Sequence, residues 1–539
     1  MRNIVLAFVT FLLLHNFYAQ EAPKTFQNPI ISGGFPDPSI CKVGDTYYIA
    51  NSSFIWYPGV PIHKSKDLVN WELVSYALNT PKHLNIDDKT GKSGGIWAPT
   101  IRYHKGLFYL TVTQKRCGTS IVSTAKNVEG PWSEPITLHS ENGIDGSLLF
   151  DDDKVWYCWS EDHEILLREF DKNENKLIGE KKLLLDENMF GDDYSHIEGP
   201  HIYKLASGEY MLLIASGGTG SNNHNISVFK SKSPKGPYAP NPKNPVLTHR
   251  NTDSGFNNIG HADIVKTQNG EWYAVTLGIR PYNGFTIMDR ETFLVKFIWE
   301  NGWPVFNPEG NGMVLEIDKR PNLPWTPVKV NANTDNFSSA KLNKDFNFYH
   351  TPTSKWWSLT DRKGWLRITL QPAKTTEQTN SPIIARKIIE FDFEASTVIE
   401  FSPKNNETAG LIVMMNQNGQ FRLEVFNDNN QKALRLVAYS LGRKTPLIEY
   451  TSKSIPITSK SVTLKVRAKG LDYQFFMENK DGSLKQIGKV MDGTLISRQR
   501  IGSYSGAYVG VFGSSNVEKS NNYADFDNFK YQTLNSENK

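Results

Sequence analysis

The N-terminal part of the chain repeats one pattern of polar and apolar positions five times. In each copy a short polar turn is followed by a strand rich in aromatic and other apolar residues, which is typical of a β-hairpin. The first aromatic residues of the five strands are separated by 61, 48, 54 and 62 residues, a spacing that suits one four-stranded blade each. The pattern therefore predicts a five-bladed β-propeller. The five segments are residues 44–49, 105–110, 153–157, 207–212 and 269–274.

The C-terminal part of the chain has a different pattern. After a Pro-rich segment at 320–325, apolar and polar residues alternate in short runs with little helical periodicity, which predicts a β-sandwich. The runs are residues 365–370, 410–414, 421–425, 462–466 and 508–512. We therefore expect an all-β protein with a propeller at 20–318, an extended linker at 319–332 and a sandwich at 333–535.

Five chemically distinctive residues occupy equivalent places in the propeller repeat. Because the first strand of every blade lines the central channel, residues at equivalent positions must converge there. Counting back 10 to 12 residues from the first aromatic of each hairpin gives Asp37, Trp97, Asp145, Glu198 and His261. The sequence thus predicts three carboxylates, a histidine and a tryptophan at similar depth on one axis.

A single carboxylate near a strand end is more often solvated or caps a turn, and the run Asp151 to Asp153 is interpreted in this way. The three axial carboxylates differ, because each lies in a segment with Gly or Pro beside it, which fixes the backbone and the direction of the side chain.

Composition and charge narrow the class of protein. The chain has 539 residues and a net charge of +4, which argues against nucleic acid or an anionic membrane as the main partner and favours a neutral ligand. Residues 1–19, with an apolar run from Ile4 to Leu14, are typical of a signal peptide, and a buried N-terminal helix is the alternative. No later segment is long and apolar enough for membrane insertion. We expect a secreted or periplasmic protein.

Cysteine usage excludes a disulfide framework and a structural zinc site. The chain contains three cysteines, Cys41, Cys117 and Cys158, and has neither a CxxC nor an HExxH motif. We interpret the three cysteines as core thiols.

Three carboxylates around one pocket indicate acid–base chemistry. Their mutual repulsion is costly unless it keeps one of them protonated, and a protonated carboxyl is what a general acid requires. Glycoside hydrolysis uses such an acid together with a second carboxylate on the other side of the sugar. Trp56, Tyr57 and Trp97 are candidate platforms for the sugar, although burial in a blade core is an equally good interpretation of each.

Several segments of the chain resemble glycoside hydrolase family 43, in particular its β-xylosidase and α-L-arabinofuranosidase branch. The resemblance runs in order from about residue 27 to 310 and continues into the second domain, for which it implies a concanavalin-like jelly roll. The matching segments are Asn28–Ile30, Phe35–Ile40, Phe54–Val60, Gly95–Pro99, Glu198–Lys204, Gly260–Ala262 and Arg290–Thr292.

The resemblance implies an inverting mechanism and a role for each site residue. Asp37 matches the general base, Glu198 the general acid, and Asp145 the residue that orients the acid and raises its pKa. His261 and Arg290 match positions at the base of the pocket, although an ion pair between blades is the alternative for Arg290. No cofactor is required for the chemistry, but a calcium ion near His261 occurs in some relatives. The sandwich is expected to support the propeller and to close one side of the pocket with a loop.

Two departures from the family pattern affect the sugar preference. Ile144 stands where an aromatic ring is usual, and Met288-Asp289 replaces the usual Leu-Gly before Arg290. In the sandwich, Asp335, Asp525 and Asp527 are candidates for a structural calcium site, with turn capping as the alternative.

We expect an exo-acting enzyme that removes terminal β-1,4-xylosyl residues from xylo-oligosaccharides. The alternatives are an α-L-arabinofuranosidase acting on arabinoxylan or arabinan, a carbohydrate-binding protein without activity, and a propeller scaffold for protein partners. The oligomeric state stays open.

Overall fold

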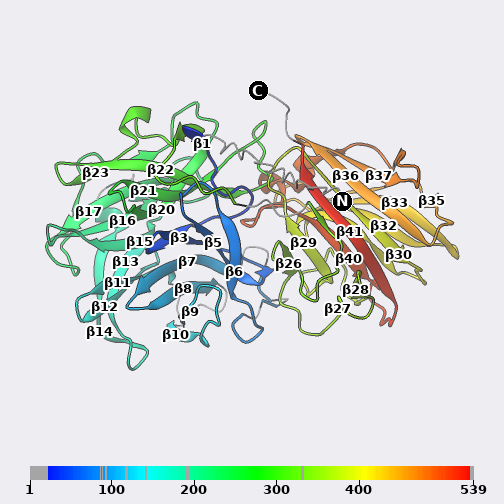
Figure 1. The fold of residues 1–539 in the computed structure, drawn as a ribbon, viewed down its shortest axis with the longest axis horizontal. Coiled ribbons are helices and arrows are strands. Elements are labelled where there is room, and N and C mark those ends of the chain that lie inside the picture. The colour runs from blue at the N-terminus through cyan, green and yellow to red at the C-terminus, as the bar shows by residue number, and fades with distance from the viewer. Residues whose placement is uncertain are drawn as a thin grey trace, which may run out of the picture.

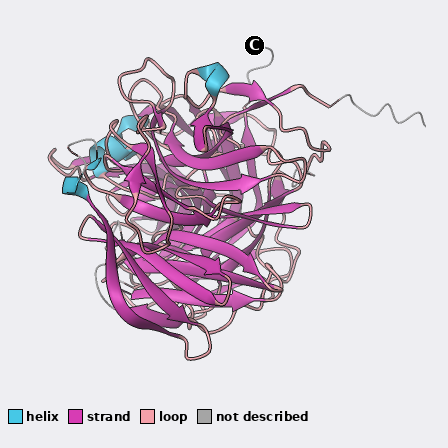
Figure 2. Cartoon of the chain, turned by 90° about the vertical axis from the view of Figure 1, so that its left-hand side faces the viewer, coloured by secondary structure: helices cyan, strands magenta, loops and turns pink. Residues whose placement is uncertain are grey.

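The computed structural model describes residues 22–534 except 85, 88, 92–93, 116–118, 140–142, 190, 192–193 and 329–332. The expected signal peptide at 1–19, Cys117 and the end of the expected linker lie outside the described residues. Two β-rich domains lie side by side, the propeller at the left of Figure 1 and the sandwich at the right. Strands dominate both domains, and the helices that the structure describes are short (Figure 2). They are η1 (Glu187–Met189), η3 (Pro308–Gly310), η4 (Gly493–Ile496) and α1 (Arg498–Ile501).

Five antiparallel sheets form the blades of the propeller, as the sequence repeat predicts. Each blade has four strands that follow one another along the chain, apart from β4, which leaves the first blade, and β19, which is added to the fourth. The first blade consists of β2 (Ser39–Val43), β3 (Thr46–Ala50), β5 (Gly59–Ser65) and β6 (Glu72–Leu78). The second consists of β7 (Gly95–His104), β8 (Leu107–Lys115), β9 (Thr119–Ala125) and β10 (Ile136–His139). The third is β11 (Ile144–Asp151), β12 (Lys154–Glu161), β13 (Glu164–Asp171), β14 (Lys176–Asp186). The fourth consists of β15 (Glu198–Lys204), β16 (Tyr210–Ser216), β17 (Asn225–Ser231), β18 (Ala239–Pro240) and β19 (Leu247–Thr248). The fifth consists of β20 (Asn257–Lys266), β21 (Trp272–Ile279), β22 (Arg290–Glu300) and β23 (Trp303–Phe306).

The first strands of the blades form a closed ring. β2, β7, β11, β15 and β20 each contact the first strands of both neighbouring blades, so the residues at their N-terminal ends face one axis. A separate two-stranded sheet of β1 (Thr25–Gln27) and β24 (Ile317–Lys319) joins the two ends of the propeller segment. This arrangement explains why residues far apart in the sequence meet at one place.

The second domain consists of two packed nine-stranded sheets, which confirms the predicted β-sandwich. One sheet contains β25 (Thr334–Asp335), β27 (Trp357–Ser358), β28 (Leu366–Thr369), β30 (Phe393–Phe401), β36 (Ser461–Lys469), β37 (Asp472–Glu478), β38 (Leu484–Gln486), β39 (Met491–Asp492) and β41 (Tyr523–Thr533). The other contains β4 (Trp56–Tyr57), β26 (Phe346–Tyr349), β29 (Ile383–Lys387), β31 (Thr408–Asn416), β32 (Gly419–Asp428), β33 (Gln431–Ser440), β34 (Ile448–Thr451), β35 (Ile455–Pro456) and β40 (Tyr508–Ser514).

The two domains share a sheet and a core. β4 belongs to the propeller segment of the sequence but pairs with β26 of the sandwich, so that Trp56 lies opposite Tyr349. One continuous cluster of buried apolar side chains extends from the first two blades into both sheets of the sandwich. The sandwich is therefore an integral part of the folded protein and not a module on a flexible linker.

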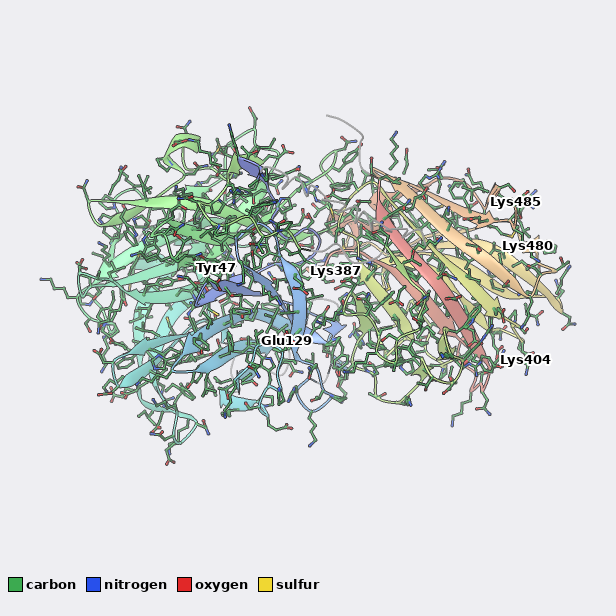
Figure 3. The ribbon with its side chains drawn as sticks, viewed as in Figure 1. Tyr47, Glu129, Lys387, Lys404, Lys480 and Lys485 are labelled. Atoms are coloured by element: carbon green, nitrogen blue, oxygen red, sulfur yellow. The ribbon has the colours of Figure 1, made fainter. Side chains whose placement is uncertain are left out.

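A buried lysine also crosses the domain boundary. Lys387 of β29 lies between the domains in Figure 3, and its ammonium group donates a hydrogen bond to the carbonyl of Gly34. Burial lowers the pKa of Lys387 to about 7. A side chain on Gly34 would collide with the carbonyl of Ser505, so glycine is required where the sandwich meets the loop that leads to Asp37.

Candidate active site

A cavity of about 730 Å³ opens at the propeller axis. Six of the seven residues that the sequence predicts for catalysis or substrate binding line it, and Trp56 is the exception. The six are Asp37, Trp97, Asp145, Glu198, His261 and Arg290. The repeat argument thus brings the three carboxylates together as predicted.

Local backbone distortions direct these side chains into the cavity. In four of the inner strands the pairing register shifts beside the site residue, and such β-bulges bend a strand and re-aim its side chains. Asp37, Asp145 and His261 adopt left-handed backbone conformations with φ of 53°, 57° and 49°. Residues other than glycine rarely adopt this conformation, and it is found where function requires a particular side-chain direction.

Asp37 is held by two side chains from different parts of the propeller. The carboxylate, which is 5% exposed, accepts a hydrogen bond from Ser52 on one oxygen and forms an ion pair with Arg290 on the other, with 2.8 Å between Nη1 and Oδ1. Charge-assisted bonds of this kind fix a carboxylate strongly. Asp37 therefore has one defined orientation.

Arg290 is in turn clamped by aromatic rings and by a hydroxyl. Its guanidinium carbon lies 5.4 Å from the ring centre of Phe54 and 5.2 Å from that of Tyr504, and Nη1 also donates to Thr219. Burial opposes its charge, but the carboxylates of Asp37 and Asp289 raise the pKa of Arg290 overall. Both interpretations of Arg290 hold: it lines the cavity, and its ion pair with Asp37 joins β22 of the fifth blade to the segment before β2 of the first blade.

Asp145 and Glu198 form the second carboxylate pair of the cavity. Burial raises the pKa of Asp145 to about 7, and the negative charges of Glu198 and Asp37 act in the same direction, whereas His261 opposes them. The Asp145 carboxylate accepts a hydrogen bond of 3.0 Å from the backbone amide of Gly199, and His261 Nδ1 lies 4.0 Å from it. The cavity therefore retains a proton on its carboxyl groups near neutral pH.

The balance differs at Glu198. Burial raises the pKa of Glu198, but His224, His261 and Arg290 outweigh this effect, so that its pKa lies below the usual value. The expectation from the family resemblance was a raised pKa on Glu198. In the ligand-free site the proton is instead favoured on Asp145, because the basic groups cluster around Glu198.

Trp56 is not a sugar platform, which corrects the prediction. Its side chain is fully buried, and its ring stacks on that of Tyr508 in the sandwich with 3.6 Å between centroids and 13° between planes. Tyr57 is also buried, and its hydroxyl donates to the carbonyl of Asn79. The aromatic residue of this segment that lines the cavity is Phe54. Pairing of β4 with the sandwich turned Trp56 towards the domain interface.

Several cavity residues were missed at the level of sequence. Tyr504 comes from the sandwich, and no feature of the sequence places it near the propeller axis. Thr219 lies in the Gly-rich segment 217–221, which the sequence could have indicated as a tight loop. His163 and His196 also line the cavity, with 4.7 Å between their ring centres.

The candidate calcium site in the sandwich is not supported. Asp525 is bound by Arg367 through both oxygens, at 2.8 and 2.9 Å, and by Arg362 at 3.0 Å. Asp335 and Asp527 accept hydrogen bonds from backbone amides one or two residues further on, as turn-capping residues do. Within the described ranges no three or more His, Cys, Asp or Glu residues are placed to hold a metal ion.

The calcium ion expected near His261 stays a prediction, and His261 lines the cavity at the propeller axis. Of the cysteines, Cys41 and Cys158 are free and buried, which confirms that they are core thiols. Among the residues that the structure describes, no helix has the length and apolar character of a membrane span.

A five-bladed propeller with three converging carboxylates defines the class of the protein as a glycoside hydrolase. Residues 26–304 match the model of glycosyl hydrolases family 43, and residues 334–532 match that of the beta xylosidase C-terminal concanavalin A-like domain. The chain belongs to glycoside hydrolase family 43, which confirms the resemblance seen in the sequence.

Individual relatives align over nearly the whole chain. The chain is 36% identical to a non-reducing end alpha-L-arabinofuranosidase of Bacteroides ovatus, covering 95% of this chain and 96% of the relative. It is 34% identical to a beta-xylosidase of Bacillus subtilis, covering 94% of this chain and 99% of that relative. Among solved structures, GH43B of a Bacteroides ovatus xyloglucan PUL superposes with a TM-score of 0.89 at 34% identity, covering 95% of this chain and 100% of that one. A xylan beta-1,4-xylosidase of Bacillus halodurans superposes with a TM-score of 0.87 at 32% identity, covering 94% and 100%.

Proposed function

We propose that the protein is an inverting exo-glycosidase that removes one terminal pentosyl unit from hemicellulose oligosaccharides, with β-1,4-linked xylosyl as the first substrate. The observation that carries the proposal is the convergence of Asp37, Asp145 and Glu198, from three different blades, in one cavity. A protein that only binds carbohydrate has no need for three carboxylates in one pocket, because their repulsion is costly.

Asp37 is the general base in this proposal. Its ion pair with Arg290 and its bond from Ser52 fix the carboxylate, so that it can take a proton from a water molecule placed against the anomeric carbon. Arg290, held between Phe54 and Tyr504, is oriented to donate hydrogen bonds to sugar hydroxyls as well.

Glu198 is the general acid, and Asp145 adjusts it. The proton of Glu198 passes to the glycosidic oxygen as the bond to the anomeric carbon breaks, and the water oxygen bonds to that carbon from the opposite face. Asp145 bonds the backbone amide of Gly199, next to Glu198, and so fixes the position of the acid. At a pH where Asp145 is protonated, Glu198 no longer has the negative charge of Asp145 beside it.

An α-L-arabinofuranosyl residue is the second candidate substrate. It is supported by the relative from Bacteroides ovatus, whose name specifies α-L-arabinofuranosides and the non-reducing end. It is also supported by Ile144, which removes an aromatic ring that the xylosidase branch usually presents to the sugar. Export of the protein through residues 1–19, for action outside the cytoplasm, is part of the proposal and rests on the sequence pattern.

The test is release of nitrophenol from the β-D-xylopyranoside and the α-L-arabinofuranoside, measured side by side for wild type and Asp37→Ala. We expect turnover of the xyloside that falls by about 10²-fold or more in the variant, because a general base is lost. Dominant turnover of the arabinofuranoside would assign the enzyme to debranching. Activity on neither glycoside, or full activity of Asp37→Ala, would contradict the proposed chemistry.

A further inference from the structure

A second histidine lies next to Glu198, outside the set that the sequence predicts. His224 directly precedes β17, and its side chain is fully buried. Its Nε2 lies 3.6 Å from Oε1 of Glu198 and, among the described residues, has no hydrogen-bond partner. A buried ring nitrogen without a hydrogen bond costs free energy, so the nearby carboxyl group of Glu198 is its expected partner.

The hydrogen bond on the other side of the ring fixes where one proton of His224 lies. Nδ1 is 2.9 Å from the backbone carbonyl of Asn258. A carbonyl only accepts hydrogen bonds, so Nδ1 carries a proton in either charge state of the ring. Nε2 is therefore the one nitrogen whose proton is free to change, and it is the nitrogen that faces the carboxylate of Glu198.

The backbone makes room for this ring specifically. A Cβ atom on Gly260 would collide with Nδ1 and Cε1 of His224, although no unusual φ requires glycine there. Residue 260 thus has to be glycine for the ring to remain in place. The position of His224 beside the acid depends on a residue that also directly precedes His261.

The charged groups of the cavity leave Glu198 as the partner of the ring. The groups that face Glu198 and its surroundings are Asp145 from β11, Asp37 beside β2, His261 from β20 and Arg290 from β22. The raised pKa of Asp145 reduces its negative charge near neutral pH, and Asp37 is paired with Arg290, so Glu198 is the carboxyl group that the ring can serve. An imidazolium at His224 places a positive charge beside the carboxylate that Glu198 becomes when it has given up its proton.

We propose that His224, as an imidazolium, is a positioning residue for the general acid: Nε2–H holds Oε1 of Glu198, so that Oε2 presents its proton to the leaving-group oxygen. This proposal rests on the proposed glycosidase function. Hydrogen bonds in ligand-free active sites are often long and shorten when substrate binds. The distance of 3.6 Å between Nε2 of His224 and Oε1 of Glu198 can shorten to that of a hydrogen bond by a small rotation of the Glu198 side chain. Glu198 alone gives up a proton to the leaving oxygen, and the negative charge that then develops on it is stabilised by the ring.

Two substitutions at His224 test the roles of its two ring nitrogens separately. In His224→Asn the side-chain amide replaces Nδ1 and retains the bond to Asn258, but nothing faces Glu198. In His224→Gln the amide reaches the place of Nε2. We expect His224→Asn to lose about tenfold to a hundredfold in kcat on a disaccharide substrate, and His224→Gln to lose clearly less. Gly260→Ala should resemble His224→Asn, because it displaces the ring.

The readout that distinguishes positioning from a structural role is the dependence on the leaving group. A 2,4-dinitrophenyl glycoside needs no protonation of its leaving group, so His224→Asn should retain its kcat on this substrate within about threefold. On the disaccharide, the alkaline limb of the pH–kcat/KM profile should move to higher pH, because a positive charge that lowers the pKa of Glu198 has been removed.

Equal losses on both substrates in a variant with wild-type melting temperature, or an alkaline limb that does not move, would overturn the role of His224 and leave the glycosidase function intact. Hydrolysis of neither glycoside by the wild-type enzyme would overturn the glycosidase function and this role together.

Discussion

The ring of Trp56, from the propeller segment, stacks on the ring of Tyr508, from the sandwich, with 3.6 Å between their centroids. β4, which carries Trp56, is at the same time an edge strand of a sandwich sheet. Two domains that share a sheet and an aromatic contact are expected to unfold together. The two domains are therefore expected to unfold as one cooperative unit, although the sequence shows a boundary between them.

Trp56→Ala should destabilise the whole protein by about 3–5 kcal/mol, because it leaves a large cavity at the domain interface. Denaturant unfolding should show one transition in wild type, shifted to lower denaturant in the variant. Trp303→Ala, at a half-buried position in β23 of the fifth blade, is the control and should cost less. Two separate transitions in the wild-type protein would contradict the shared core.

Tyr504→Ala should weaken substrate binding through Arg290. The ring of Tyr504 lies against the Arg290 guanidinium, and contacts of this kind contribute about 0.5–2 kcal/mol. We expect KM to rise by about threefold to tenfold while the protein stays folded, and Tyr504→Phe, which retains the ring, to restore most of the affinity. The comparison is made by steady-state kinetics. An unchanged KM in Tyr504→Ala would show that the sandwich does not contribute to the binding cavity.

The raised pKa of Asp145 predicts a pH dependence of stability. In the unfolded chain Asp145 ionises near pH 3.8, whereas burial raises its pKa in the folded protein to about 7. Between these values the folded state binds more protons than the unfolded state, so this group's contribution to stability is present at low pH and is lost as the pH rises to about 7.

Asp145→Asn cannot ionise and should therefore be more stable than wild type at pH 8 by about 1–3 kcal/mol, and similar to wild type at pH 4. Denaturant unfolding at the two pH values measures this difference. Asp162→Asn, an exposed aspartate at the mouth of the cavity, serves as the control and should change neither value. A difference that is the same at both pH values would mean that Asp145 is ionised throughout.

The sequence allowed the propeller, the sandwich and the three carboxylates of the cavity to be predicted because each depends on a local or periodic signal. The hairpin repeat sets the five inner strands, and counting along them finds Asp37, Asp145 and Glu198. Trp56 was assigned wrongly because its environment depends on pairing between β4 and β26, almost three hundred residues apart in the sequence.

Tyr504 and His224 could not be predicted for related reasons. Tyr504 reaches the cavity only because the sandwich is docked on the propeller. His224 lies outside the inner strands and approaches Glu198 through a space left by Gly260. Contacts of this kind are set by tertiary packing, and no periodic pattern in the sequence marks them.

The stereochemistry of hydrolysis distinguishes a general base at Asp37 from a nucleophile at the same position. Proton NMR of a β-D-xyloside during hydrolysis by the wild-type enzyme identifies the anomer that is formed first, before mutarotation. We expect α-xylose, because in the proposed mechanism Asp37 directs water to the face opposite the leaving group while Glu198 protonates the leaving oxygen. β-Xylose as the first product would show a covalent intermediate with retention, and would contradict the assignment of Asp37 as a base.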